Sequence, residues 1–84
     1  MAAQIDDLKE IGRIVYFHRR KSGMSRVQLA ALAGVGKTAV YDLEHGKTTL
    51  QLETLSRILN ALNIHIALTS PLIDLYMEEE NAES

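Results

Sequence analysis

The spacing of apolar residues along the chain predicts helices first and a strand near the end. Over 5–21, apolar residues recur mainly at steps of three and four, the period of a helix with one buried stripe. They are Ile5, Leu8, Ile11, Val15 and Tyr16. Gly23 follows at a position that ends a helix. The sequence therefore predicts a first helix over 5–21.

Two short helices are predicted next, each bounded by residues that begin or end a helix. Ser25, with a glutamine three residues later, has the pattern of a capping box, and Gly34 closes the helix that follows. A third helix is predicted over 37–44, between Gly36 as its N-cap and Gly46 as its end. The apolar residues of the second helix are Val27, Leu29, Ala30 and Leu32.

A fourth helix, of about three turns, is predicted to begin near residue 51, because apolar residues keep helical spacing from there. They are Leu52, Leu55, Ile58, Leu59 and Leu62. The period then changes to two, because Ile64, Ile66 and Leu68 alternate with His65, Ala67 and Thr69. This alternation predicts a strand over 64–69 with one buried face.

Residues 70–84 are predicted to form an acidic tail, separate from a single domain over 1–69. Pro71 blocks continuation of the strand, and the following LIDLYM predicts at most a last turn. The end, EEENAES, is too charged and too poor in apolar residues to pack. We expect a tail that is at least partly disordered, and it serves either as a solubilising end or as a segment that a partner or protease recognises.

The middle of the chain has the requirements of two helices that cross at a large angle. Ala30 supplies a small contact point, and Gly34 supplies the left-handed turn position. Val40 and Leu43 give the third helix an apolar underside. The stretch 26–46 is therefore predicted to be a helix-turn-helix, whose second helix points four side chains outward: Lys37, Thr38, Tyr41 and Asp42.

Charge is distributed unevenly, although the formal net charge is only −2 over 84 residues. Residues 11–50 contain seven Lys and Arg against two acids, whereas residues 51–84 contain one Arg against six acids. Because nucleic-acid binding depends on the local field, this basic middle is compatible with a DNA partner. The whole surface is not expected to bind polyanions.

Several function classes are excluded by what the composition lacks. The chain has no cysteine, no basic N-terminal region before an apolar core and no apolar run of about 18 residues, so we expect a cytoplasmic protein without a membrane segment. The histidines His18, His45 and His65 are too widely spaced to suggest a metal site. No catalytic arrangement stands out, and we expect neither an enzyme nor a cofactor.

A resemblance to a known family lies in residues 23–47, which read GMSRVQLAALAGVGKTAVYDLEHGK. They resemble the phage-repressor-like (Cro/C1, or XRE) helix-turn-helix family, with the pattern G-x-T-Q-x-x-L-A, then G-(V/I)-S-x-x-x-I-S-x-(W/L)-E-x-G. The resemblance covers roughly 8–62. Arg26 replaces the family's usual Gln, and Gly36 its usual Ser or Thr. Matching residues are Gly23, Ser25, Leu29, Ala30, Gly34, Val35, Val40, Leu43, Glu44 and Gly46.

The resemblance implies that the third helix reads DNA, whereas without it the same side chains are an ordinary solvated face. Lys37 can donate to guanine or phosphate, Thr38 can contact a base edge or a thymine methyl, and Tyr41 can reach phosphate or base. Asp42 either accepts from a cytosine amino group or only excludes wrong sequences.

Further residues are implied to contact the DNA backbone or to support the motif. The backbone contacts are Arg26, the N–H of Gly36, Lys47 and Thr48, with unspecific surface charge as the alternative for the side chains. The family often joins the positions of Arg19 and Glu44 by an ion pair.

The strand directly after the fourth helix resembles the HipB-type antitoxins. This resemblance implies a mainly α fold, a four- to five-helix repressor-like domain whose C-terminal β-strand pairs across a homodimer through Ile64, Ile66 and Leu68. It further implies a repressor that binds an inverted-repeat operator in double-stranded DNA and holds a HipA-type kinase toxin. The alternatives are a free-standing repressor and, less in keeping with a polar third helix, a protein-interaction module.

Overall fold

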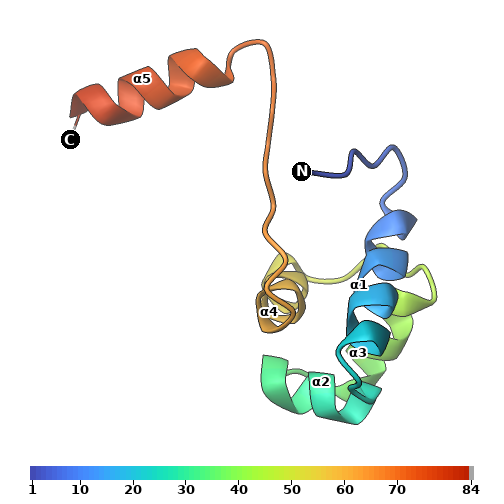
Figure 1. Cartoon of the computed structure of the whole chain (residues 1–84). Helices are drawn as coiled ribbons and strands as arrows, with labels where there is room; N and C mark the ends of the chain where they lie inside the picture. The colour runs from blue at the N-terminus through green and yellow to red at the C-terminus, as the bar shows by residue number, and fades with distance from the viewer. Residues whose placement is uncertain (84) are drawn as a thin grey trace.

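The computed structural model describes residues 1–83 and contains five helices and no strand in that part of the chain (Figure 1). The first four helices form a small body, and the fifth projects away from it on an extended segment. The fold is the mainly helical, repressor-like helix-turn-helix that the sequence predicts. The helices are α1 (Lys9–Lys21), α2 (Arg26–Ala33), α3 (Lys37–Glu44), α4 (Leu52–Ala61) and α5 (Ile73–Glu83).

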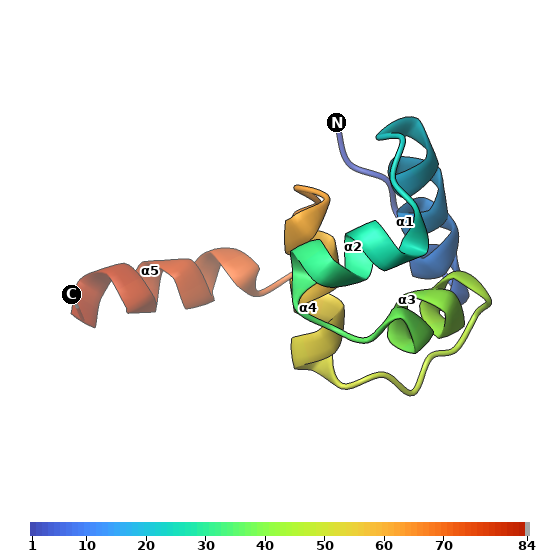
Figure 2. The same cartoon turned by 90° about the horizontal axis from the view of Figure 1, so that it is seen from below.

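One apolar core lies between the first four helices. Helix α2 contacts both α3 and α4, while α1 contacts α3, so the core joins all four (Figure 2). Burial of these side chains supplies the main stabilisation of the body, because removing apolar surface from water is the dominant favourable term in folding. The buried apolar residues are Val15, Leu29, Ala30, Val40, Leu43, Ile58 and Leu59.

Both ends of α2 follow the local signals of the sequence. Ser25 Oγ accepts a hydrogen bond from the Gln28 N–H at 3.1 Å, and the Gln28 side chain accepts from the Ser25 N–H at 2.8 Å, which completes the capping box. Gly34 adopts φ +72°, and the Val35 N–H donates to the Ala30 carbonyl at 3.0 Å. The glycine is needed here because side chains disfavour this left-handed conformation.

Helix α1 is shorter than predicted, and only part of its predicted stripe, Ile11 and Val15, faces the core. It begins at Lys9, where the Asp7 carboxylate accepts a hydrogen bond from the Lys9 N–H at 2.9 Å. Leu8 and Tyr16, two of its predicted apolar positions, are exposed. Gly12 and Arg19 are buried beside Val15 instead, since α3 lies against this side of α1.

At Gly12, α1 lies so close to the backbone of α3 that no side chain would fit between them. A Cβ at this position would lie 1.9 Å from the carbonyl oxygen of Leu43. A glycine in the middle of a helix costs roughly 1 kcal/mol relative to alanine, so its presence there needs a packing reason. The approach to α3 supplies that reason.

We expect Gly12→Ala to destabilise the chain because a methyl group there forces two backbones apart. The free energy of unfolding should fall by about 1–3 kcal/mol or more, which lowers Tm by roughly 4 °C or more in a domain of this size. Thermal unfolding followed by circular dichroism measures the change. Gly36→Ala is the control, because nothing lies within 4 Å of a Cβ there; equal Tm values for the two variants would contradict the packing role.

The predicted strand over 64–69 is not formed within the described part of a single chain. Helix α4 ends at Ala61, Asn63 in the turn after it has φ +58°, and the chain then runs extended with no neighbouring strand to pair with. The three residues predicted to form the dimer interface also differ in their surroundings. Ile64 packs against the core of its own chain, whereas Ile66 and Leu68 are exposed.

The segment predicted to be an acidic, at least partly disordered tail contains a helix in this structure. Helix α5 covers Ile73–Glu83, where the sequence predicts at most one turn. Its Leu, Met, Glu and Ala residues have high helix propensity, and Asp74 in the first turn interacts favourably with the helix dipole. Local propensity therefore favours a helix in this segment despite its charge.

Candidate nucleic-acid interface

Helix α3 is seated on the core by one face and presents the other to solvent. Val40 and Leu43 are buried underneath it. Lys37, Thr38 and Tyr41 are exposed on the opposite face. The helix is therefore held by apolar contacts while its polar side chains are open to solvent, the arrangement that a recognition helix in the major groove requires.

Tyr41 is the centre of a small cluster at this surface. Its ring stacks on the His45 ring, with centroids 3.9 Å apart and an interplanar angle of 21°. The Arg26 guanidinium lies 5.3 Å from the Tyr41 centroid, within cation–π range. His45 Nδ1 also lies 2.7 Å from the Tyr41 carbonyl oxygen. The two ring contacts, with His45 and Arg26, limit the rotamers of Tyr41, although neither was evident from the sequence.

Asp42 and Lys47 form an ion pair that the sequence pattern does not reveal. Lys47 Nζ lies 3.6 Å from Asp42 Oδ2, and both side chains are partly exposed. The Lys47 N–H also donates to the Asp42 carbonyl at 2.9 Å. The pair places a cation beside the acid at the edge of α3, so the negative charge of Asp42 is balanced at the surface that α3 presents to solvent.

Glu44 joins the helix-turn-helix to α1 through Arg19. Its carboxylate is fully buried and accepts hydrogen bonds from Arg19 at 2.7 and 3.0 Å. The resemblance implied this ion pair, and the structure contains it. Arg19 also donates to the Met24 carbonyl at 2.9 Å. The hydrogen bond to Glu44 raises the pKa of Arg19, against the opposing effect of burial.

Arg26 is the second partner of the Glu44 carboxylate. Arg26 Nε lies 3.0 Å from Glu44 Oε1, and 36% of the Arg26 side chain stays exposed. The sequence indicated only a backbone contact to DNA for this residue. The structure adds an internal role, because Glu44 and Tyr41 hold the guanidinium in one place at the N-terminal end of α2.

The remaining predicted contacts lie around the ends of α3. Gly36 is the N-cap, and no side chain caps the first turn of α3, so its N–H groups are available to a phosphate. Thr48 is exposed in the loop after α3, next to Lys47. The predicted contact residues on α3 and at its ends thus lie around one helix, with Arg26 joined to them through Tyr41.

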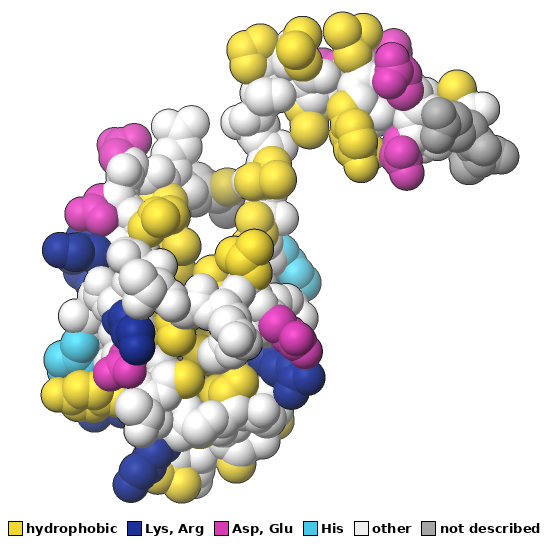
Figure 3. All heavy atoms as spheres, turned by 180° about the vertical axis from the view of Figure 1, so that it is seen from behind, with side chains coloured by type: hydrophobic (Ala, Val, Ile, Leu, Met, Phe, Trp, Pro, Cys, Tyr) yellow, Lys and Arg dark blue, Asp and Glu magenta, His cyan; other side chains and the backbone are white. Residues whose placement is uncertain are grey.

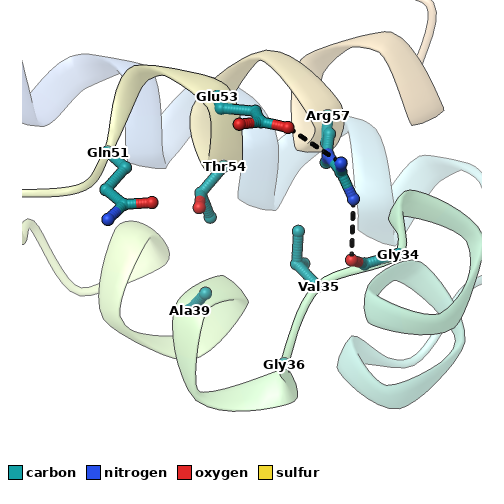
Figure 4. A pocket seen from close by; sticks show the side chains of 8 residues that line it. All are labelled: Gly34, Val35, Gly36, Ala39, Gln51, Glu53, Thr54 and Arg57. Atoms are coloured by element: carbon teal, nitrogen blue, oxygen red, sulfur yellow. Dashed lines mark hydrogen bonds and ion pairs between the residues drawn. The ribbon is translucent and has the colours of Figure 1, made fainter.

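A cleft of about 310 Å³ opens between the N-terminal end of α3 and α4 (Figure 4). Arg57 crosses it, donating to Glu53 at 2.8 Å and to the Gly34 carbonyl at 3.4 Å. Because Arg57 is hydrogen-bonded on both sides, it links α4 to the turn between α2 and α3. Its eight lining residues are Gly34, Val35, Gly36, Ala39, Gln51, Glu53, Thr54 and Arg57.

Other kinds of site are not found among residues 1–83. No group of three or more His, Asp or Glu side chains in this part of the chain is arranged to hold a metal ion. None of the five described helices has the length and hydropathy needed to span a membrane.

Three comparisons with known proteins agree on this region. The sequence model of the helix-turn-helix family matches residues 18–68. A curated relative, the uncharacterized HTH-type transcriptional regulator y4mF of Sinorhizobium fredii, is 34% identical over 71 residues, which cover 84% of this chain and 93% of the relative.

Solved structures share the fold at lower sequence identity. The chain is 18% identical to HipB in a HipA–HipB–O2–O3 complex, with a TM-score of 0.75, covering 83% of this chain and 99% of that one. A structure described as MDT protein gives the same values. A HipB variant in complex with an O2 20mer is similar as well, with a TM-score of 0.75 and 18% identity over 84% of this chain and 99% of the other.

Proposed function

Since the chain belongs to the XRE-type helix-turn-helix family of DNA-binding transcriptional regulators, we propose that it is a sequence-specific repressor acting as a homodimer on an inverted-repeat operator. The observation that carries this proposal is the polar face of α3 above a buried Val40 and Leu43. In this proposal, Lys37, Thr38 and Tyr41 contact base edges or nearby phosphates in the major groove. The chain acts by binding and performs no catalysis.

The residues around α3 are proposed to hold the DNA backbone. Arg26, the Gly36 N–H, Lys47 and Thr48 would position the helix by contacts to phosphates, which carry no sequence information themselves. The pairing of Asp42 with Lys47 supports this division, because it keeps a cation beside an acid that must approach a polyanion.

Replacing Lys37 should separate base reading from backbone binding. We expect Lys37→Ala to weaken operator binding by about 1–3 kcal/mol with little loss on random DNA. Lys47→Ala should weaken both DNAs similarly and reduce the slope of log affinity against log salt by about one. Fluorescence anisotropy at several salt concentrations measures these effects. If Lys37→Ala loses equal affinity for operator and random DNA, α3 does not read bases through this residue.

We further propose that the repressor is the antitoxin of a HipA-type kinase and represses its own operon. The support is the likeness of the fold to HipB in its complex with HipA. Co-expression with the product of the adjacent reading frame tests the pairing. Co-elution of the chain with a kinase-like protein supports an antitoxin, whereas operator binding without any such partner indicates a free-standing repressor.

A further inference from the structure

Helix α5 exposes apolar side chains that the rest of its own chain does not cover. Leu72, directly before the helix, and Leu75, Tyr76 and Met77 within it are each at least half exposed. In both views of the fold, α5 points away from the body formed by α1 to α4 (Figures 1 and 2). An isolated helix of 11 residues is only marginally stable in water, so α5 needs a surface to pack against.

The charge of this segment specifies what such a surface must offer. No Lys or Arg occurs after Arg57, while α5 contains Asp74 and a run of three glutamates over 78–80. Figure 3 shows apolar side chains along the extended segment and α5, with acidic side chains on the helix. The complementary surface is therefore apolar and basic.

Helix α1 presents a surface of that kind on the side away from the core. Tyr16 and Phe17 are exposed there and are surrounded by cations. Arg20 donates to the Tyr16 hydroxyl at 3.1 Å, and Lys21 Nζ lies 5.6 Å from the Phe17 centroid. We name this surface the aromatic-basic face of α1; its residues are Arg13, Tyr16, Phe17, Arg20 and Lys21.

We propose that α5 of one chain docks on the aromatic-basic face of α1 in a second copy. The inference rests on the proposed homodimer, because antiparallel pairing of the 64–69 segments carries the end of each segment past the start of its partner. Each α5 is thereby delivered to the other subunit. Apolar contacts of Leu72 and Tyr76 with Phe17 are flanked by acidic residues of α5 that meet Arg20 and Lys21.

Disulfide trapping tests the docking, because the chain has no cysteine of its own. Two differently tagged chains, one with Phe17→Cys and the other with Tyr76→Cys, are mixed and oxidised. We expect a disulfide between the two different chains. The control replaces Phe17→Cys by Ser56→Cys, an exposed position on α4, and should cross-link at least about ten-fold more slowly.

Charge reversal provides the second arm of the test. Arg20→Glu with Lys21→Glu should lower the trapping rate at least about ten-fold, and Glu78→Lys with Glu79→Lys in the other chain should restore it. Sedimentation of the untrapped chain separates two failures. A dimer without the 17–76 disulfide overturns the docking and leaves the proposed repressor intact, whereas a monomer at every concentration overturns the homodimer itself. A third variant carries both Phe17→Cys and Tyr76→Cys in one chain. A disulfide that forms only within that chain also overturns docking on a second copy.

Discussion

Ile66→Asp is expected to convert the proposed homodimer into monomers and to reduce operator affinity by roughly 10³-fold or more, to the level of non-specific binding. In the proposed dimer, residues 64–69 of two chains pair antiparallel, which satisfies their backbone N–H and C=O groups. A charge at residue 66 would lie in the shared apolar face, where an unpaired carboxylate is strongly unfavourable. Because one half-site alone is bound weakly, losing the dimer also loses the operator.

The structure indicates why residue 66 is the right position for this test. Ile66 is 66% exposed in the single chain, so aspartate there leaves the helical body undisturbed. Ile64 is unsuitable because it packs against the core of its own chain. Each apolar side chain is worth roughly 1.5–3 kcal/mol when fully buried, so the pairs formed by Ile66 and Leu68 are a substantial part of the proposed interface.

Analytical ultracentrifugation and operator binding measure the effect of Ile66→Asp, with circular dichroism to show that the helices persist. Ala67→Asp is the matched control, because it adds the same charge next to Ile66 on the other side of an extended segment. A dimeric Ile66→Asp chain that still binds its operator would show that the subunits meet through helix faces instead.

Glu44→Ala is expected to lower thermal stability more than the replacement of any surface acid such as Glu79. The Glu44 carboxylate is 0% exposed and accepts hydrogen bonds from Arg19 and Arg26. Its removal leaves the buried Arg19 guanidinium without its counter-charge, which costs about 3–5 kcal/mol. In a domain of this size that loss lowers Tm by roughly 12 °C or more. The intact pair contributes less than this in net terms, because burying both charges is itself unfavourable.

Thermal unfolding of three variants tests the role of the carboxylate. Glu79→Ala removes an acid from the exposed surface of α5 and should change Tm little. Glu44→Gln keeps the side-chain volume and one acceptor, so its Tm should lie between those of Glu44→Ala and the unchanged chain. Equal Tm values for Glu44→Ala and Glu79→Ala would eliminate the structural role of the ion pair.

Local signals in the sequence were sufficient to predict the helix-turn-helix. The capping box at Ser25 and the left-handed Gly34 act within a few residues, so their effect is readable without knowing the fold. Helix α3 has the predicted bounds, and the spacing of Val40 and Leu43 identified its buried face correctly. Short-range backbone geometry and side-chain period decide these features, and both are properties of sequence order.

Contacts between distant residues were decided only by the tertiary structure. Gly12 meets Leu43 across a helix crossing, and Arg26 shares the Glu44 carboxylate with Arg19. A sequence period does not specify which neighbour covers each position, and for the same reason Leu8 and Tyr16 are exposed although their spacing predicted burial. The segment 64–69 shows the limit most clearly, since an alternating pattern encodes the ability to pair, but a strand forms only where the assembly supplies another strand.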